Sequence, residues 1–271
     1  MKKIILITGA SSGMGKETAK NLIQQGHTVY AVARRIDQMQ DLQSLGGHPI
    51  QMDVTKEQDI QNVVDTIINK EGKIDVLWNN AGYGLYGAVE DVPVEEARKQ
   101  FEVNLFGLAA ITQKVLPYMR NAKAGTIINT SSMGGKMYTP MGAWYHASKH
   151  ALEGFSDCLR LELQPFGINV VVLEPGIIVT EFGDVMLKNI SKFSSKGAYS
   201  SLTNKLIAAT QKMYDKGQGS KTSVISKTIS GIVNDVKPKT RYRVGLWAKP
   251  MVWLRIYLGD KLFDKIVMSQ V

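Results

Sequence analysis

Regular alternation of strand-like and helix-like segments over the first 180 residues most strongly limits the folds open to this chain. The strand-like runs are short, β-branched and continuously apolar, as strands covered on both faces tend to be. They are Ile4–Thr8, Thr28–Ala33, Pro49–Met52, Val76–Trp78, Thr126–Thr130 and Ile168–Leu173. Stretches with helical spacing separate them, among them Lys56–Lys70, Val94–Arg120 and Ala143–Gln164. This order predicts an α/β fold, a doubly wound parallel sheet with helices on both faces.

The sequence changes character after Pro175-Gly176. Residues 182–240 are rich in Ser, Lys and Thr, with helical spacing near Leu202–Tyr214 and Ser223–Val236, and Arg241–Val244 has the pattern of a last strand. No repeat or low-complexity tract divides the chain. We therefore predict a single domain over residues 1–271, with a helical elaboration from residue 181 onward.

The net charge of +9 lies entirely in the C-terminal third. Residues 1–180 carry 17 Lys/Arg and 18 Asp/Glu, whereas residues 181–271 carry 16 and 6. Such an excess suits an anionic substrate, an acidic partner or an anionic membrane surface. The lysines are scattered singly, however, which favours a solvated face. Without a motif or a compact basic stripe, we expect no nucleic-acid binding.

Two features bear on where the protein resides. The apolar run after Met1 lasts only from Ile4 to Ile7, too short for the core of a signal peptide, and no stretch approaches the ~20 apolar residues of a membrane-spanning helix. The single cysteine, Cys158, excludes an internal disulfide framework. We expect a cytoplasmic protein.

Trp247–Leu258 mixes aromatic and aliphatic residues with Lys249 and Arg255. This composition allows three interpretations: the stretch lies on a membrane surface, covers a substrate pocket, or completes the core. We favour lid or core packing over membrane contact.

A glycine-rich loop follows the first strand-like run and leads into a helix. It reads Thr8-Gly9-Ala10-Ser11-Ser12-Gly13-Met14-Gly15. Glycines permit a tight bend and a close approach of the backbone to a pyrophosphate, while the helix N-terminus favours anions. The spacing differs from the standard G-x-G-x-x-G, but the strand before it and the helix after it predict a dinucleotide site.

Arg34 and Arg35 follow the second strand-like run. An NAD site usually has an acidic residue there for the ribose 2′-hydroxyl, whereas arginine accommodates a 2′-phosphate. We therefore predict NADP(H), although Asp37 lies close in the sequence and solvent exposure of both arginines is the alternative.

Tyr145 and Lys149 stand four residues apart in a helical stretch, so their side chains share one face. A phenol with a pKa near ~10 exchanges protons poorly at neutral pH, and a nearby ammonium group lowers that pKa. The pair suits proton transfer.

Five features in this order resemble the short-chain dehydrogenase/reductase family over the first two-thirds of the chain. They are the loop Thr8–Gly15, Asn79-Asn80-Ala81-Gly82, Ser132, the pair Tyr145 and Lys149, and Pro175-Gly176. The resemblance implies a Rossmann-type sheet, with residues 1–180 as cofactor and catalytic core and residues 181–271 as substrate lid and C-terminal elaboration.

The resemblance also implies catalytic roles. Tyr145 would be the general acid of reduction, Lys149 would hold the nicotinamide ribose and lower the tyrosine pKa, and Ser132 would bind the substrate oxygen, with Ser131 as its rival. Asn104 would hold a proton-relay water.

Further residues would contact the cofactor. Asn80, Ala81 and Gly82 would lie along the adenosine side, Asp53 and Val54 against the adenine, and Thr180 at the carboxamide. The complete predicted set is Gly9, Ser11, Ser12, Gly13, Met14, Gly15, Arg34, Arg35, Asp53, Val54, Asn80, Ala81, Gly82, Tyr145, Lys149, Pro175, Gly176 and Thr180.

His146, His150 and Glu153 have a spacing that could bring metal ligands to one helix face. The family chemistry needs no metal, so we expect none and interpret these residues as a polar face or a subunit contact. A homo-oligomer is expected because this helix often packs against its copy in the family.

The favoured function is hydride transfer between NADP(H) and a carbonyl or secondary alcohol of a small molecule. The basic tail and the arginine pair are similar to the hydroxysteroid and retinol dehydrogenase branch, which implies a bulky apolar substrate. The alternatives are a 3-oxoacyl-(acyl-carrier-protein) reductase, a non-catalytic dinucleotide-binding regulator, and a peripheral membrane enzyme.

Overall fold

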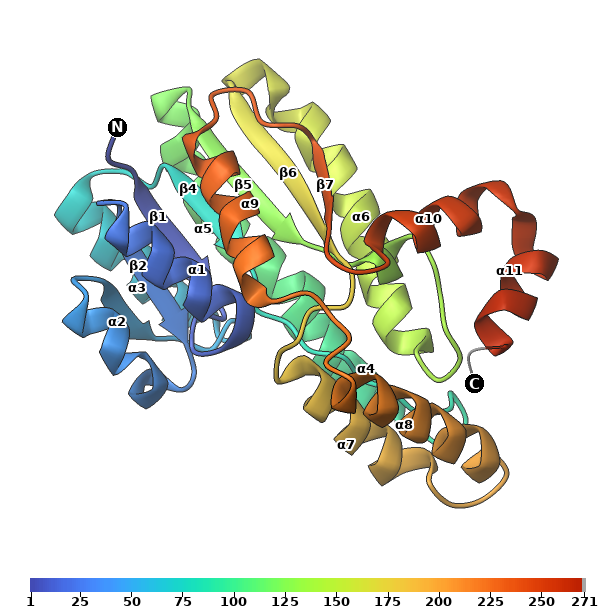
Figure 1. The fold of residues 1–271 in the computed structure, drawn as a ribbon. Coiled ribbons are helices and arrows are strands. Elements are labelled where there is room, and N and C mark those ends of the chain that lie inside the picture. Colours follow the sequence, from blue (N-terminus) through green and yellow to red (C-terminus); the bar gives the residue numbers. More distant parts are fainter. Residues whose placement is uncertain (270–271) are drawn as a thin grey trace.

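The seven strands of the computed structural model, which describes residues 1–269, all pair in parallel (Figure 1). They lie in the order β3-β2-β1-β4-β5-β6-β7. Their bounds are β1 Ile4–Thr8, β2 Thr28–Ala33, β3 His48–Gln51, β4 Val76–Asn79, β5 Gly125–Thr130, β6 Ile168–Pro175 and β7 Arg241–Val244. The strand order reverses between β1 and β4, which is where open α/β sheets bind ligands. The predicted doubly wound, Rossmann-type single domain is confirmed.

Helices cover both faces of this sheet. They are α1 Gly13–Gln24, α2 Gln40–Ser44, α3 Glu57–Glu71, α4 Val94–Phe101, α5 Gly107–Ala122, α6 Ala143–Leu163, α7 Phe182–Ser194, α8 Ser200–Asp215, α9 Thr222–Asn234, α10 Ala248–Tyr257 and α11 Gly259–Met268. Short helical turns are η1 Ile36–Met39, η2 Glu102–Phe106, η3 Met133–Gly135 and η4 Gln164–Phe166.

Alternating side chains of each strand enter two separate cores. Ile4 and Leu6 of β1 pack with α3, α5 and α6 on one face, whereas Ile5 and Ile7 pack with α1, α2 and α9 on the other. The period of two in a strand divides one continuous apolar run between the two faces. This explains why the runs read as apolar throughout.

The stretch Val94–Arg120, predicted to have helical spacing, is helical throughout, but it contains a π-turn. The π-helical segment η2 separates α4 from α5, and its buried Asn104 bonds to the backbone of Tyr83. A π-turn inserts one extra residue in a helical turn and often marks a functional site. Hydrophobic spacing carries no information about these hydrogen bonds of Asn104. It therefore predicts the helix but not the π-turn within it.

Two helical pairs extend beyond the sheet. The pair α7–α8 lies past the carboxyl ends of the strands, and α10 and α11 project from the side next to β7 (Figure 1). Among residues 1–269, every helix is too short or too polar to cross a bilayer.

Candidate active site

The loop between β1 and α1 turns on glycines that adopt left-handed backbone angles. Gly9 has φ 67° and Gly13 has φ 52°. A Cβ on Gly9 would lie 2.8 Å from the Cα of Ala81, so a larger residue would displace the neighbouring backbone. Ser12 precedes α1 without a side-chain capping bond. The loop therefore presents the first turn of α1 without a protein side chain as its cap.

Asn80 holds this loop against the end of β4. Its Nδ2 donates to the carbonyl oxygens of Thr8 and Gly9, both at 3.1 Å, and the N–H groups of Asn80 and Ala81 both donate to Thr8 Oγ1 at 3.0 Å. Its Oδ1 is buried and has no hydrogen-bond partner among the described residues. The side chains of Asn80 and Thr8 thus connect the ends of the two strands at the reversal point.

Arg35 lies beside the glycine loop. Its Nη2 donates to Ser12 Oγ at 3.1 Å and to Ser11 Oγ at 3.4 Å, and it forms an ion pair with Glu181 at 3.2 Å. Arg34 is exposed at the end of β2. Of the two predicted arginines, Arg35 is the one that contacts the loop serines.

Other predicted cofactor residues surround the same edge of the sheet. Asp53 follows β3 and its Oδ1 accepts from Thr55, whereas the Val54 backbone packs against Gly107 at the start of α5. Thr180 lies across from the glycine loop, because a Cβ on Gly13 would be 3.3 Å from its Cγ2.

The remaining predicted cofactor residues lie at or near these contacts. Pro175 ends β6, and the N–H of the following Gly176 donates to the carbonyl oxygen of Val244 at 2.8 Å. Met14 packs against the core on the α1 side.

Tyr145 is 7% exposed, in the first turn of α6. Burial raises the pKa of Tyr145 to about 12, and a hydrogen bond with the Ser132 side chain opposes that rise. Ser132 Oγ also accepts from the Gly134 N–H at 3.0 Å. Its rival Ser131 is buried with no partner for its hydroxyl in the described chain. Of the two serines, the structure brings Ser132 to the tyrosine.

Lys149 is buried one turn further along α6. Its Nζ donates to the carbonyl oxygen of Thr130 at 2.8 Å. Burial lowers the pKa of Lys149 to about 8, while the negative charge of Glu153 acts in the opposite direction. The ammonium group is thus held at the carboxyl end of β5.

Asn104 of η2 completes this group. Its Nδ2 donates to Tyr83 O at 3.0 Å and to Ser148 Oγ at 3.1 Å, and its Oδ1 accepts from the Tyr83 N–H at 3.1 Å. A Cβ on Gly82 would lie 3.1 Å from Asn104 Oδ1 and 3.7 Å from Lys149 Nζ. Gly82 therefore lies beside both side chains, where any other residue would crowd them.

His146 fixes the loop that follows Ser132. Its Nδ1 lies 2.9 Å from Gly134 O and its Nε2 accepts from the Thr139 N–H at 3.0 Å. Burial lowers the pKa of His146 to about 4, so the ring is neutral at pH 7. Sequence reasoning missed this role because the two bonded backbone groups belong to a loop that has no motif.

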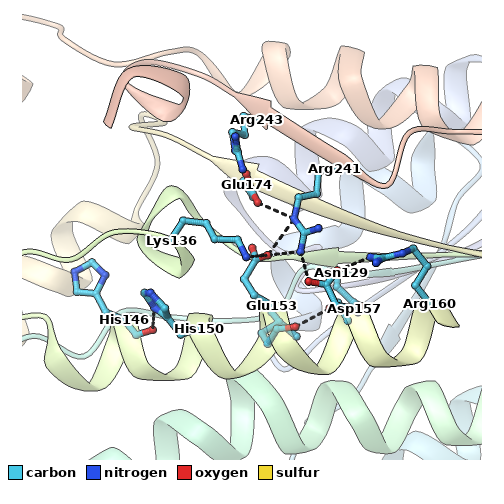
Figure 2. A network of polar contacts seen from close by, with 12 residues as sticks. Asn129, Lys136, His146, His150, Glu153, Asp157, Arg160, Glu174, Arg241 and Arg243 are labelled. Carbon is cyan, nitrogen blue, oxygen red and sulfur yellow. Dashed lines mark hydrogen bonds and ion pairs between the residues drawn. The ribbon is translucent and has the colours of Figure 1, made fainter. Parts of the chain in front are cut away.

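Glu153 lies in a network of charged groups that joins α6 to β6 and β7 (Figure 2). Its Oε2 is 2.8 Å from Arg241 Nη2 and 3.1 Å from Lys136 Nζ. Arg241 also reaches Asp157 at 2.7 Å and Glu174 at 3.1 Å. The interpretation of His146, His150 and Glu153 as a polar face or a subunit contact does not hold for His146 and Glu153, which are buried inside the chain, whereas His150 is exposed. Among residues 1–269, no cluster of three His, Cys, Asp or Glu residues has metal-binding geometry.

Apolar side chains surround the Tyr145 ring, and sequence reasoning missed them. The Tyr86 ring lies 5.6 Å and the Phe182 ring 5.4 Å from it, centroid to centroid. We call the surrounding set the apolar cluster: Tyr86, Ala88, Met141, Tyr145, Phe182, Met186, Ile190, Tyr199, Leu202, Leu206 and Ile207. It joins α7 and α8 to the candidate catalytic residue.

Comparison with known proteins identifies the family. The family described as short chain dehydrogenase matches residues 3–190. A 3-ketodihydrosphingosine reductase of Bacteroides thetaiotaomicron is 39% identical over 259 residues, which cover 93% of each chain.

The chain belongs to the short-chain dehydrogenase family.

Solved structures of similar proteins agree with this assignment. A short-chain dehydrogenase from Streptomyces avermitilis has a TM-score of 0.81 and 29% identity, with 99% of both chains covered. The closed form of serine dehydrogenase complexed with NADP+ has a TM-score of 0.79 and 27% identity, covering 91% of this chain and 96% of that one. A 3-ketoacyl-(acyl-carrier-protein) reductase from Brucella melitensis, complexed with NADH, has a TM-score of 0.75 and 26% identity, over 88% and 94%.

This short-chain dehydrogenase is therefore an oxidoreductase of CH–OH groups that uses a nicotinamide dinucleotide and a small-molecule substrate. The residues present fit such a cofactor. The left-handed turn at Gly9 and Gly13 leaves the start of α1 uncapped, and the buried Asn80 Oδ1 retains an unused acceptor beside it.

Proposed function

We propose that this short-chain dehydrogenase reduces a ketone on a long, apolar substrate, with NADPH as cofactor and Tyr145 as proton donor. The observation that carries the proposal is the buried Tyr145 hydroxyl, hydrogen-bonded with Ser132 and surrounded by the apolar cluster. A buried phenol beside a serine suits protonation of a carbonyl oxygen in a site from which water is excluded.

When bound, the reduced dinucleotide supplies the hydride that adds to the carbonyl carbon. Tyr145 donates its hydroxyl proton to the carbonyl oxygen, and Ser132 donates a hydrogen bond to that same oxygen. Lys149 binds the ribose hydroxyls. Its positive charge favours the phenolate form of Tyr145 and so lowers the pKa of the tyrosine. Asn104 holds the water through which the proton is replaced. Each role is the one that the family resemblance implies.

Specificity for NADPH is supported by Arg35. Its guanidinium lies at the loop serines, Ser11 and Ser12, and its partner Glu181 is exposed, so a phosphate can take the place of that carboxylate. Similar solved structures contain NADP+ in one case and NADH in another, so the fold alone does not decide between the two dinucleotides. The proposed preference for NADPH therefore depends on Arg35.

Two observations support a long apolar substrate. The apolar cluster packs residues of α7 and α8 around Tyr145, and the Bacteroides relative is named a 3-ketodihydrosphingosine reductase. The hydroxysteroid or retinol dehydrogenase branch remains a prediction. A non-catalytic regulator is less favoured, because Asn104, Ser132, Tyr145 and Lys149 are all present and grouped. An acyl-carrier-protein reductase is less favoured because of the name of the Bacteroides relative.

NADPH oxidation at 340 nm, measured against ketones of increasing chain length, tests the proposal. We expect kcat/KM to rise with the length of the apolar chain, because each buried methylene contributes about 0.8 kcal/mol. Turnover that is independent of chain length would overturn the substrate class, and binding of NADPH with no turnover of any ketone would favour the regulator.

A further inference from the structure

Helix α10 exposes large apolar side chains on its outer side. Trp253 is 55%, Ile256 54% and Tyr257 68% exposed, and the rings of Trp253 and Tyr257 lie 5.4 Å apart. Ala248 and Val252, on the inner side, are fully buried. The prediction that Trp247–Leu258 packs as lid or core therefore holds only for the inner side. A contiguous exposed apolar surface of this kind marks a binding surface.

Helix α11, like α10, has a buried inner side and an exposed outer side. Phe263 and Val267 face inward and are buried, whereas Leu262 is 46% and Met268 51% exposed. Both helices project from the domain beside β7 (Figure 1), and Lys249 and Trp253 of α10 line an open groove with Arg241 and Arg243 of β7. Each of the two helices thus exposes large apolar side chains beyond the catalytic fold.

Positive charge accompanies this apolar surface. Lys249, Lys261 and Lys265 are exposed, and none forms an ion pair with any residue from 1 to 269. Of the two acidic groups of these helices, Asp260 pairs with Arg255 at 2.8 Å, whereas Asp264 accepts from the Tyr138 hydroxyl at 2.8 Å and keeps its negative charge. The three lysines therefore still outnumber the one carboxylate that no cation of the described chain neutralises. We define the C-terminal patch as Lys249, Trp253, Ile256, Tyr257, Lys261, Leu262, Lys265 and Met268.

We propose that the C-terminal patch binds the surface of an anionic phospholipid bilayer. Tryptophan and tyrosine favour the boundary between acyl chains and headgroups, and lysines beside them reach anionic headgroups. The alternative occupant, a second copy of this chain, would bring the unpaired lysines of two patches together. Charge complementarity therefore selects a negative surface over another patch of the same sign.

Binding at the patch also orients the candidate active site. The inner side of α11 packs against the loop after Ser132 through Met137, Tyr138 and Phe263. The loop therefore lies behind α11, on the side away from the bilayer, when the patch is bound. Binding of the C-terminal patch to a bilayer requires no turnover. It can therefore be tested independently of the proposed function.

Cosedimentation of the whole chain with vesicles tests the proposal. We expect binding to phosphatidylglycerol/phosphatidylcholine vesicles, at least tenfold weaker binding to pure phosphatidylcholine, and release at 1 M salt, where the Debye length is about 3 Å. The variants Trp253→Ala/Tyr257→Ala and Lys249→Glu/Lys261→Glu/Lys265→Glu should each reduce binding about tenfold or more.

Matched controls alter other exposed surfaces. Leu161→Ala/Phe166→Ala removes exposed apolar groups at the far end of α6 and in η4, and Lys2→Glu/Lys56→Glu/Lys70→Glu makes the same change in net charge on exposed lysines elsewhere. Both should bind like the parent chain. Equal loss in patch and control variants, or no binding of the parent chain to anionic vesicles, overturns the proposal. Dimerisation that Trp253→Ala/Tyr257→Ala abolishes would assign the patch to a second copy.

Discussion

The ring of Phe182 lies 5.4 Å from the ring of Tyr145, and a Cβ on Gly84 would lie 2.6 Å from Phe182 Cζ. The first residue of α7 therefore fills the space between Gly84 and the candidate catalytic phenol. A substrate that reaches the Tyr145 hydroxyl has to share or displace this ring. Phe182 thus limits the size of the group that lies next to the reacting carbonyl.

Replacement of Phe182 by Ala should shift specificity toward bulkier ketones. We expect the ratio of kcat/KM for a branched ketone to that for a small one to rise about tenfold, the usual scale of pocket discrimination. Val185→Ala, a truncation of a more exposed residue on α7, is the control. An unchanged ratio in Phe182→Ala would place the substrate elsewhere.

Replacement of Tyr145 by Phe should remove the proton donor while the ring and its packing remain. We expect kcat to fall about 10²–10⁴-fold, the usual contribution of general acid catalysis, with NADPH affinity nearly unchanged. Stopped-flow turnover and fluorescence titration of NADPH measure the two quantities. A variant that retains a tenth of the parent rate would contradict the assignment.

Removal of the Arg34 and Arg35 side chains should weaken NADPH binding more than NADH binding. An arginine hydrogen-bonded to a phosphate contributes about 1.5–3 kcal/mol, which corresponds to at least a tenfold loss of NADPH affinity. Arg35→Ala should account for most of it, because Arg35 contacts the loop serines. Equal losses for the two dinucleotides would refute the 2′-phosphate assignment, and Arg98→Ala is the control.

Acidification should destabilise the fold through His146. Burial lowers the pKa of this ring to about 4 in the folded chain, from an ordinary value of 6.5. Between these two values the unfolded chain binds more protons than the folded one, so stability rises with pH and falls as pH drops from 6.5 toward 4. The shift corresponds to a loss of about 3 kcal/mol in that window.

Urea unfolding at pH 7 and pH 4.5 measures this effect. The variant His146→Gln should show a smaller difference between the two pH values, with lower stability at pH 7. His150→Gln is the matched control, because that ring is exposed on the same helix. An identical pH dependence in His146→Gln and the parent chain would contradict the prediction.

Replacement of Arg241 by Met should strongly destabilise the chain. Arg241 bonds to Glu153 and Glu174, which are 2% and 0% exposed, so its loss leaves buried carboxylates with fewer partners. Removal of one member of a buried ion pair costs about 3–5 kcal/mol. Arg98→Met, which removes an exposed pair with Glu95, should change the free energy of unfolding by at most about 1 kcal/mol. Similar values for both variants would contradict the prediction.

Sequence alone predicts the inner strands β1, β2, β4 and β6 well, because each buries both faces and so has a largely apolar run. The outer strands β3 and β7 are only partly buried and lack such a run. The runs Ile4–Thr8, Thr28–Ala33 and Arg241–Val244 match β1, β2 and β7 to the residue. The π-turn at η2 was not predicted, since the hydrogen bonds of Asn104 to Tyr83 connect residues 21 positions apart.

Residues of the candidate site can be predicted from the sequence only where they belong to a motif. Tyr145 and Lys149 follow from their helical spacing, but Tyr86 and Phe182 come from loops and helices that the tertiary fold alone brings to the phenol. The same holds for Glu181, which meets Arg35 across 146 positions. The homo-oligomer remains a prediction, because the structure describes one chain.

Glu174 ends the sheet's second-to-last strand fully enclosed, and the cations that form ion pairs with it within residues 1–269 are Arg241 and Arg243. Those two arginines follow Glu174 by 67 and 69 positions. A nascent chain that ends before Arg241 therefore contains this carboxyl group without its two counter-charges. We expect the burial of Glu174 during translation to be completed only after β7 has been synthesised.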